Sequence, residues 1–374
     1  MRRVNHRRID EKEFMTAHLF GPFHLDDLIL SNRMVMAPMT RNRADQNGNV
    51  TPLMVTYYQQ RASAGLIVAE STAVSPDAVG YPFVPGLYTD EQAQSWLSVT
   101  NAVHSAGGRI FVQLQHCGRI SHPSLQPAGV APVAPSPIQP AGQAVTYTGA
   151  RDFVTPRELE TNEIPSFIAK FQHAAAAARR AGFDGVEVHA GNGYLIDQFL
   201  RDGTNRREDS YGGSVQKRMR FLSEIIDAVC DVWPSSRVGV RLTPENSFNS
   251  MSDSDPQGHF SYFLKELNRR SLAYVHLLEG DIVSQPPAVD YRALRSSFRG
   301  CYVAGKGYDL NSAKRAVGEG SADLVAFGIP FLANPDLVRR YREALPLNSA
   351  DPATFYGGGE RGYTDYPFFP SGSQ

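Results

Sequence analysis

The sequence predicts an α/β protein folded as a single (β/α)8 TIM barrel. Short β-branched runs alternate with helical patterns eight times over about 330 residues, which is the repeat of this barrel. The chain of 374 residues is long enough to form one barrel of this size. A doubly wound sheet is the alternative, but its glycine-rich phosphate loop would follow the first strand, where residues 38–43 contain no glycine.

Short apolar runs predict the strands, and helical spacing of apolar residues predicts the helices. The predicted strands are Met34–Ala37, Leu66–Glu70, Arg109–Gln115, Gly185–His189, Val238–Leu242, Tyr274–Leu278, Tyr302–Ala304 and Leu324–Phe327. The predicted helices lie near 52–64, 91–105, 163–181, 215–232, 258–270, 288–298, 310–318 and 335–344. The third helix has the clearest pattern, because Pro165 suits its first turn and Gly182 follows its last.

Three segments stand outside this repeat. Residues 19–30 predict a small hairpin that caps the barrel floor. The proline-rich stretch 116–160 after the third strand is the longest irregular segment, and we interpret it as a lid over the barrel mouth. Residues 1–14 are rich in arginine but lack an apolar run, so they predict a disordered extension rather than a secretory signal. The barrel is therefore assigned to residues 15–374.

Composition excludes several function classes. The formal net charge of −1 disfavours nucleic acid or an anionic membrane as the main partner. No apolar run is long enough to span a membrane. The cysteines at 117, 230 and 301 are far apart and form no CxxC pair, which removes zinc-finger and iron–sulfur interpretations and favours a reducing, cytoplasmic location.

The carboxyl ends of the strands should face one common site in a barrel of this kind. These ends supply Thr40, Glu70, Ser71, Gln113, Gln115, His189, Asn192, Tyr194, Arg241, Gly305, Lys306, Gly307 and Gly328. The set is rich in hydrogen-bond donors and contains neither a metal-ligand cluster nor a Ser–His–Asp arrangement. Glycines at the seventh and eighth strand ends match the usual phosphate site of such barrels, where backbone N–H groups hold the anion.

The residues that follow the fourth strand are the most informative. Gly191 and Gly193 let the backbone turn sharply, so that His189, Asn192 and Tyr194 can converge on one spot. Two donors beside a weak acid can polarise a carbonyl or nitro oxygen and then deliver a proton. The alternative is that the histidine only satisfies a strand end and that the tyrosine only packs.

Several motifs, in this order along the chain, resemble the old yellow enzyme family of FMN-dependent ene-reductases on a (β/α)8 barrel. They are residues 37–41, 57–62, 112–119, 189–200, 211–214, 333–337 and 356–359. The resemblance covers about residues 18–367, nearly the whole chain. Thr40, where another branch of the family carries cysteine, resembles the branch of the yeast, plant and pentaerythritol-tetranitrate reductases.

The resemblance implies a role for each site residue. The implied FMN-binding residues are Pro38, Met39, Thr40, Ser71, Gln113, Arg241, Gly305, Lys306, Gly307 and Gly328. The implied catalytic residues are His189 and Asn192, which would hold the substrate oxygen, and Tyr194, which would protonate carbon. The implied substrate pocket contains Tyr81, Gln115 and Tyr356.

The resemblance also implies the reaction. NADPH, or NADH, would reduce the flavin and leave before the substrate binds, which is a ping-pong mechanism. The substrate would be an electron-poor alkene, namely an α,β-unsaturated carbonyl or nitro compound, with nitro and nitrate ester groups as further acceptors. The family's barrels occur as monomers and homodimers, and both states are compatible with this sequence.

Two positions depart from the family pattern. Ile329 stands where this branch usually carries an arginine that grips the FMN phosphate, and the neighbouring Lys306 is either a compensating charge or a solvated loop lysine. Gln115 stands where close relatives often have an aromatic residue, which predicts a wider and more polar pocket. The first departure favours an alternative function, a flavin-poor barrel that binds or isomerises a phosphorylated metabolite. A binding relic without activity is a third possibility.

Overall fold

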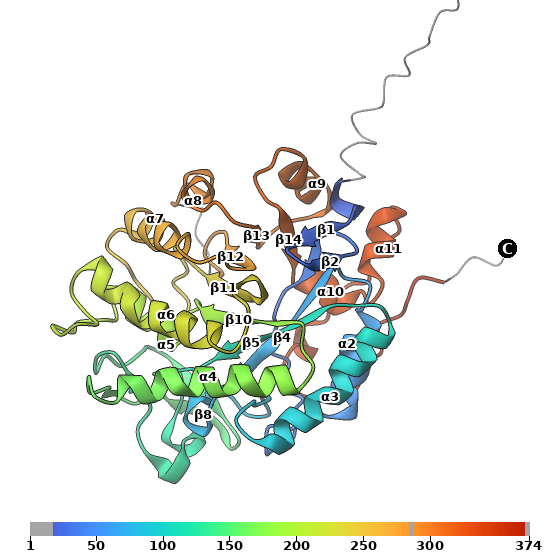
Figure 1. Ribbon diagram of the computed structural model, residues 1–374. Helices are drawn as coiled ribbons and strands as arrows, with labels where there is room; N and C mark the ends of the chain where they lie inside the picture. Colours follow the sequence, from blue (N-terminus) through green and yellow to red (C-terminus); the bar gives the residue numbers. More distant parts are fainter. Residues whose placement is uncertain (1–17, 284–287, 371–374) are drawn as a thin grey trace, which may run out of the picture.

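Eight parallel strands close into a barrel in the computed structural model, which describes residues 18–283 and 288–370 (Figure 1). Around the barrel the strands run in the order β10-β11-β12-β13-β14-β3-β4-β5. Their bounds are β3 (Met34–Met36), β4 (Leu66–Ala73), β5 (Ile110–Gln115), β10 (Gly185–Ala190), β11 (Val238–Leu242), β12 (Tyr274–Leu278), β13 (Tyr302–Gly305) and β14 (Leu324–Phe327). The predicted fold class and all eight predicted strands are confirmed.

Helices surround the barrel, and each predicted helix is present among the described residues (Figure 1). They are α2 (Pro52–Gln60), α3 (Asp90–Ser105), α4 (Ile164–Arg180), α6 (Val215–Cys230), α7 (Pro256–Leu267), α8 (Tyr291–Ser297), α9 (Leu310–Gly318) and α11 (Leu337–Arg342). Two short helices were not predicted, α5 (Leu195–Leu200) and α10 (Ile329–Ala333). Helix α5 begins shortly after β10, and α10 begins shortly after β14. Each helix is too short to give a periodic signal in the sequence.

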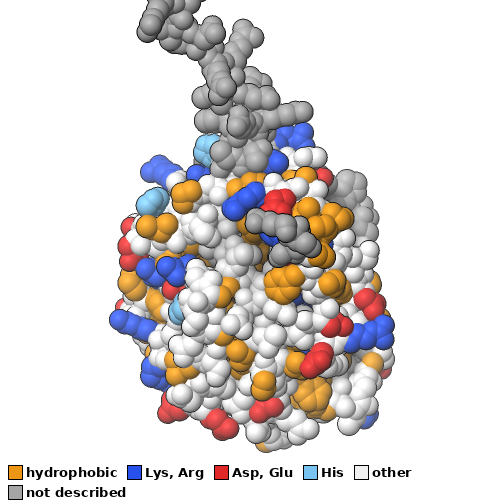
Figure 2. All heavy atoms as spheres, turned by 90° about the vertical axis from the view of Figure 1, so that its right-hand side faces the viewer, with side chains coloured by type: hydrophobic (Ala, Val, Ile, Leu, Met, Phe, Trp, Pro, Cys, Tyr) orange, Lys and Arg blue, Asp and Glu red, His pale blue; other side chains and the backbone are white. Residues whose placement is uncertain are grey.

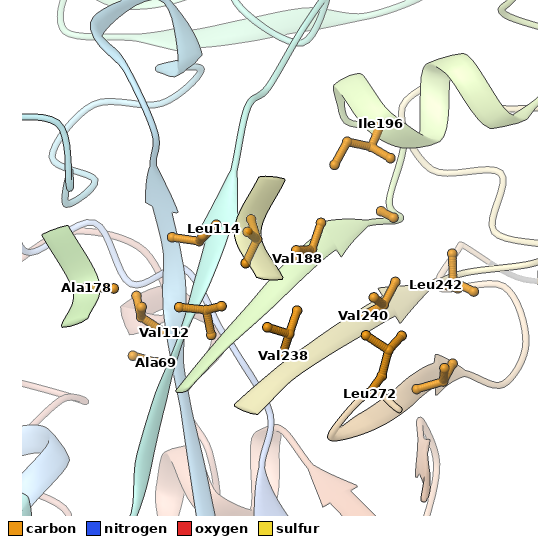
Figure 3. Packing of buried hydrophobic residues seen from close by; sticks show 14 of the residues in the cluster. Ala69, Val112, Leu114, Ala178, Val188, Ile196, Val238, Val240, Leu242 and Leu272 are labelled. Atoms are coloured by element: carbon orange, nitrogen blue, oxygen red, sulfur yellow. The ribbon is translucent and has the colours of Figure 1, made fainter. Parts of the chain in front are cut away.

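Alternation along the strands separates two apolar clusters. In β4, Leu66 and Val68 belong to a cluster inside the barrel, whereas Ile67 and Ala69 belong to the large cluster between the strands and the helices. Figure 3 shows this outer cluster, in which valines of β5, β10 and β11 pack with Ala178 of α4. Because the period of a strand is two, the residues between these valines face the barrel interior.

The predicted hairpin is present as β1 (Phe23–Leu25) and β2 (Leu28–Leu30), which pair antiparallel. Its buried leucines share the inner cluster with side chains from the amino-terminal halves of the barrel strands, such as Phe111 and Leu324. The hairpin therefore covers apolar surface at the end of the barrel opposite the carboxyl ends of the strands. The extension predicted for residues 1–14 lies outside the described residues.

The stretch 116–160 is less irregular than predicted, since it contains two small sheets. They consist of β6 (Val133–Ala134) with β9 (Arg157–Glu158), and β7 (Gln143–Thr146) with β8 (Gly149–Asp152). Buried Arg119 fastens this stretch to the loop after β11, because its guanidinium donates to the carbonyls of Ile138 at 3.0 Å and Ser250 at 2.9 Å. The role of this stretch as a lid stays a prediction.

Charged side chains of both signs are interspersed on the face shown in Figure 2, rather than gathered by sign. This distribution agrees with the formal net charge of −1. None of the described helices combines the length and the apolar character that crossing a membrane requires.

Candidate active site

The register of neighbouring strands places five polar side chains side by side inside the barrel. Gln113 of β5 is the partner of Glu187 in β10. His189, two residues further along β10, is the partner of Arg241 in β11, which in turn is the partner of His276 in β12. All five side chains are buried. The sequence indicated three of them but not Glu187 or His276. The period of two, counted back from His189, was a signal for Glu187.

Glu187 is the acceptor at the centre of this layer. Gln113 Nε2 donates to Glu187 Oε1 at 2.6 Å, and His276 Nδ1 lies 3.0 Å from Glu187 Oε2. Burial alone would raise the pKa of this carboxyl group, but His276 and Arg241 together hold it below its ordinary value. The carboxylate therefore balances the buried guanidinium of Arg241. Ser71 completes the chain, because its hydroxyl donates to Gln113 Oε1.

A β-bulge in β4 separates Ser71 from its neighbour Glu70. The register of β4 against β5 shifts between Ala69 and Ser71, so that Ser71 stays beside Gln113. Glu70 turns to a different environment, where its carboxylate accepts from the Tyr58 hydroxyl at 3.1 Å and from a backbone N–H. The prediction that Glu70 faces the common site is therefore wrong. Regular alternation would turn Glu70 inward after Leu66 and Val68, but the bulge gives that direction to Ser71 instead.

One ring nitrogen of His189 is unpartnered within the described part of the chain. Its Nδ1 is buried and has no hydrogen-bond partner among the described residues. Burial, and then the charge of Arg241, lower its pKa well below the ordinary range. The imidazole is therefore neutral at pH 7, and it can donate one hydrogen bond without carrying a charge.

Tyr194 lies against this histidine. The two rings meet edge to face with their centroids 5.2 Å apart. Burial, and then the neighbouring Tyr81, raise the pKa of Tyr194 well above its ordinary value. Its hydroxyl lies 3.2 Å from the hydroxyl of Tyr81, and either can donate. Tyr194 therefore keeps its proton at any working pH.

Asn192 sits in the turn between these two residues, and neither flanking glycine has room for a Cβ. A Cβ at Gly191 would lie 2.7 Å from Thr243, and one at Gly193, where φ is +76°, would lie 2.7 Å from Asn249. Asn192 itself has φ of 55°. The structure thus brings His189, near the end of β10, into contact with Tyr194, and Asn192 lies in the turn between them.

The predicted pocket residues occupy different depths. Tyr81 packs in a buried cluster with Tyr194 and Cys117. Gln115 is buried, its Nε2 donates to Cys117 Sγ at 3.0 Å, and its Oε1 has no partner among the described residues. Tyr356 is 72% exposed, so it stands at the rim and not in the wall. A separate surface hollow, lined by residues 157–161 and 207–209, includes none of these side chains.

The predicted phosphate end contains Gly305, Lys306, Gly307 and Gly328. A Cβ at Gly307, where φ is +76°, would meet nothing within 4 Å, and Gly328 directly precedes α10. The ammonium of Lys306 donates to the backbone carbonyl of Asp281, a partner that the sequence did not predict. Lys306 is therefore held by the loop after β12, and whether it reaches a phosphate stays a prediction.

Residues 38–40, which follow β3, lie near Arg241 and Gly328. Pro38 is buried, and its carbonyl accepts from Arg241 Nη1 at 3.5 Å. Met39 lies beside Gly328, since a Cβ there would be 3.5 Å from its sulfur. Thr40 is half-buried in the same segment.

These residues fit a bound flavin. Arg241 is a buried permanent cation whose Nε has no partner among the described residues, and it suits the negative charge of a reduced flavin ring. The open space beside Gly307 suits an anion that approaches the backbone closely. Buried polar atoms of His189 and Gln115 have no partner among the described residues.

A group able to hold a metal ion lies elsewhere among the described residues. Ligand atoms of Asp202, Asp253 and His259 lie within 4.8 Å of one another. His259 Nδ1 is already 2.5 Å from Asp253 Oδ1, and the guanidinium of Arg218 lies 4.0 Å from Asp202. A cation thus already faces this group. That the site itself uses no metal stays a prediction.

Comparison with known proteins identifies close relatives. Residues 18–348 match the NADH:flavin oxidoreductase / NADH oxidase family. A probable flavin mononucleotide-dependent alkene reductase of Leishmania infantum is 44% identical over 344 residues, which are 91% of this chain and 94% of that protein. A putative 12-oxophytodienoate reductase 11 of Oryza sativa subsp. japonica is 42% identical over 367 residues, 95% of this chain and 99% of that protein.

Solved structures of flavin enzymes have the same fold as this chain. Morphinone reductase superposes with a TM-score of 0.91 at 46% identity, covering 94% of this chain and 96% of its own. An old yellow enzyme homologue from Zymomonas mobilis has a TM-score of 0.90 at 40% identity, covering 94% and 99%. Morphinone reductase has also been solved in complex with tetrahydroNAD.

These relationships confirm the predicted enzyme class and cofactors, FMN with a nicotinamide nucleotide as electron donor. They favour the redox enzyme over the alternatives of a flavin-poor barrel or an inactive relic. The chain belongs to the NADH:flavin oxidoreductase / NADH oxidase family, the family of the old yellow enzyme, and is an FMN-dependent NAD(P)H:flavin oxidoreductase.

Proposed function

We propose that this enzyme reduces the activated C=C bond of α,β-unsaturated carbonyl or nitro compounds, with NAD(P)H as electron donor and Tyr194 as proton donor. One observation carries the proposal: an uncharged donor, His189 of β10, lies against a buried tyrosine that keeps its proton. The names of the relatives, as alkene, 12-oxophytodienoate and morphinone reductases, support the same reaction class.

His189 and Asn192 hold the substrate oxygen in this proposal. When bound, FMN takes a hydride from NAD(P)H and passes it to the β carbon of the substrate. Negative charge then grows on the carbonyl or nitro oxygen, where the two side chains donate hydrogen bonds. One donor aimed at such an oxygen stabilises a transition state by roughly 3 kcal/mol. Because the imidazole is neutral, it stabilises this charge without being deprotonated itself.

Tyr194 then supplies the proton to the carbon next to the activating group. Its raised pKa keeps the proton in place until the adjacent carbon gains negative charge. Tyr81, whose hydroxyl is 3.2 Å away, holds the phenol in position and lines the pocket with Gln115. Tyr356 closes the pocket from the rim.

The FMN contacts are proposed from the same layer. Gln113 and Arg241 contact the pyrimidine side of the ring, while Pro38, Met39, Thr40 and Ser71 line it. Gly305, Lys306, Gly307 and Gly328 hold the phosphate. Support comes from the strand register that places Gln113 and Arg241 inside the barrel, and from the free space beside the backbone of Gly307. Assignment to the threonine branch of the family rests on Thr40 alone.

The colour of the purified protein provides the first test. We expect flavin absorbance after purification or after addition of FMN, and NADPH oxidation that 2-cyclohexenone accelerates. Initial rates at several fixed enone concentrations should give parallel double-reciprocal lines, because both substrates use one site in turn. A colourless protein that takes up no FMN, or an enone without effect on the rate, would contradict the proposal.

A further inference from the structure

The amide of Asn192 can present either of its ends to a substrate. The NH2 end donates to an oxygen, whereas the carbonyl end repels it. The two ends have nearly the same shape, so packing cannot choose between them. Which end faces the pocket therefore depends on the hydrogen-bond partners of Asn192 in the protein.

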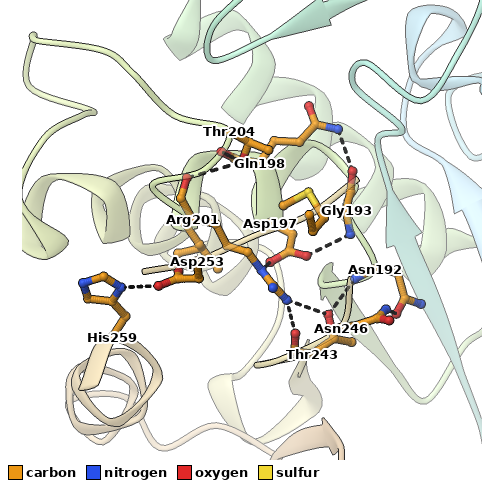
Figure 4. Close-up of polar contacts among 12 residues, drawn as sticks. Asn192, Gly193, Asp197, Gln198, Arg201, Thr204, Thr243, Asn246, Asp253 and His259 are labelled. Atoms are coloured by element: carbon orange, nitrogen blue, oxygen red, sulfur yellow. Dashed lines mark hydrogen bonds and ion pairs between the residues drawn. The ribbon is translucent and has the colours of Figure 1, made fainter. Parts of the chain in front are cut away.

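Asn246 is the partner of that amide. Its side chain lies in the loop after β11 and is fully buried. Asn246 Nδ2 donates to Asn192 Oδ1 at 2.9 Å. Figure 4 shows the two side chains facing each other. The carbonyl end of Asn192 is thereby engaged, and its NH2 end has no partner among the described residues.

The orientation of Asn246 is itself determined by the backbone. Its Oδ1 accepts the N–H groups of Phe248 and Ile282, each at 3.3 Å. A backbone N–H can only donate, so the oxygen of Asn246 must face these two groups. Its NH2 end is then left for Asn192. The backbone N–H groups of Phe248 and Ile282 thus orient the amide of Asn246, and Asn246 in turn orients the amide of Asn192.

The backbone of Asn192 is held separately. Its N–H donates to Thr243 Oγ1 at 2.8 Å, and its carbonyl accepts from Asn249 Nδ2 at 2.8 Å. With φ at 55°, the turn positions the side chain, and rotation of the terminal amide is the freedom that remains. Asn246 removes that freedom.

We propose that Asn246 is a positioning residue, which makes Asn192 a hydrogen-bond donor toward the substrate oxygen. The inference rests on the proposed role of Asn192. It also assigns a function to the loop after β12, because Ile282 supplies one of the two backbone donors. Asn246 itself touches neither substrate nor cofactor in this account.

Asn246→Asp is the decisive variant. In its ionised form the carboxylate has the same shape and still accepts both backbone N–H groups, but it cannot donate to Asn192. The amide of Asn192 must then turn its NH2 end to the carboxylate and present its oxygen to the substrate. We expect kcat/KM for 2-cyclohexenone to fall about 100-fold or more, at least as far as in Asn192→Ala, since a repelling atom is worse than a missing one.

The double variant separates this reversal from general damage. Once Asn192→Ala has removed the amide, Asn246→Asp has nothing to reverse, and we expect a further change of about twofold or less. If Asn246→Asp costs the same with and without Asn192, the proposal is overturned. Asn268→Asp is the matched control, because its amide also accepts a backbone N–H and donates to an oxygen, but that oxygen is the carbonyl of Ser297. Its effect should be similar in both backgrounds.

Two further outcomes keep the proposals distinguishable. If Asn192→Ala has normal kcat/KM, the proposed role of Asn192 fails, whatever Asn246 does. If Asn246→Asp does not fold with flavin bound, Asn246→Ala replaces it. That variant lets the amide of Asn192 take both orientations, so we expect a loss smaller than in Asn192→Ala, and a larger loss would overturn the inference.

Discussion

The two halves of the active site are held by different means. His189 and Arg241 lie on barrel strands, where parallel pairing makes them direct neighbours. Asn192, Asn246 and Lys306 lie in loops, where side-chain hydrogen bonds hold them. The strand half is determined by backbone pairing that most substitutions leave intact. The loop half depends on hydrogen bonds of single side chains. One changed atom, as in Asn246→Asp, can therefore turn a hydrogen-bond donor of the site into an acceptor.

Tyr194→Phe tests the loop half and has the largest expected effect. Without the hydroxyl, the proton donor is lost, and turnover of poorly activated enones should fall about 10²–10⁴-fold. Reduction of the flavin by NADPH should be nearly unchanged, as measured by stopped-flow absorbance. Tyr81→Phe is the control, because it breaks the same hydrogen bond between the two hydroxyls but keeps the hydroxyl of Tyr194. Equal damage to both half-reactions would show that the tyrosine is assigned wrongly.

Glu187→Gln tests the strand half. The variant leaves the buried guanidinium of Arg241 without its balancing carboxylate, and we expect the free energy of unfolding in urea to fall by about 3 kcal/mol. Glu279→Gln is the matched control, because the carboxylate of Glu279 accepts from the hydroxyls of Tyr302 and Tyr308 and has no basic partner among the described residues. That change should cost about 1 kcal/mol. Equal losses would mean that charge balance does not stabilise the inner layer.

Glu70, beside the bulge of β4, gives a prediction with a defined pH dependence. Burial raises its pKa from 4.5 to about 7. A raised carboxyl pKa contributes stability that is full below pH 4.5 and is lost as pH rises through 7. Relative to Glu70→Gln, the wild type should therefore lose up to about 3 kcal/mol between pH 4.5 and 8. Urea unfolding at both pH values measures this, and parallel curves would show that Glu70 titrates normally.

Lys306→Ala has the smallest expected effect. If the ammonium contributes to phosphate binding in place of the missing arginine, the Kd for FMN should rise about tenfold, equivalent to about 1.4 kcal/mol. The effect is limited because Lys306 is exposed and already donates to the carbonyl of Asp281. Lys217→Ala, at an exposed position on α6, is the control. An unchanged Kd would leave Lys306 as a tether between two loops.

Prediction from sequence succeeded where a local pattern was sufficient. Alternation indicated the eight strands, and Gly191 and Gly193 indicated the sharp turn between His189 and Tyr194. Prediction from sequence failed where a side chain's hydrogen-bond partner is distant in the chain. Glu187 and His276 are 89 residues apart, and no local pattern connects them. Glu70 was misplaced because a bulge shifts the alternation by one residue.

The sequence by itself determined the barrel, the flavin-enzyme family and the residue types at the strand ends, because periodicity and motifs are local properties of the chain. Only the tertiary structure decided how those residues are paired, charged and oriented. His189 is neutral because folding buries it beside Arg241, and Asn192 offers its NH2 end because Asn246 engages its oxygen. Burial and hydrogen-bond direction depend on neighbours from other strands and loops, and those neighbours exist only once the barrel has closed.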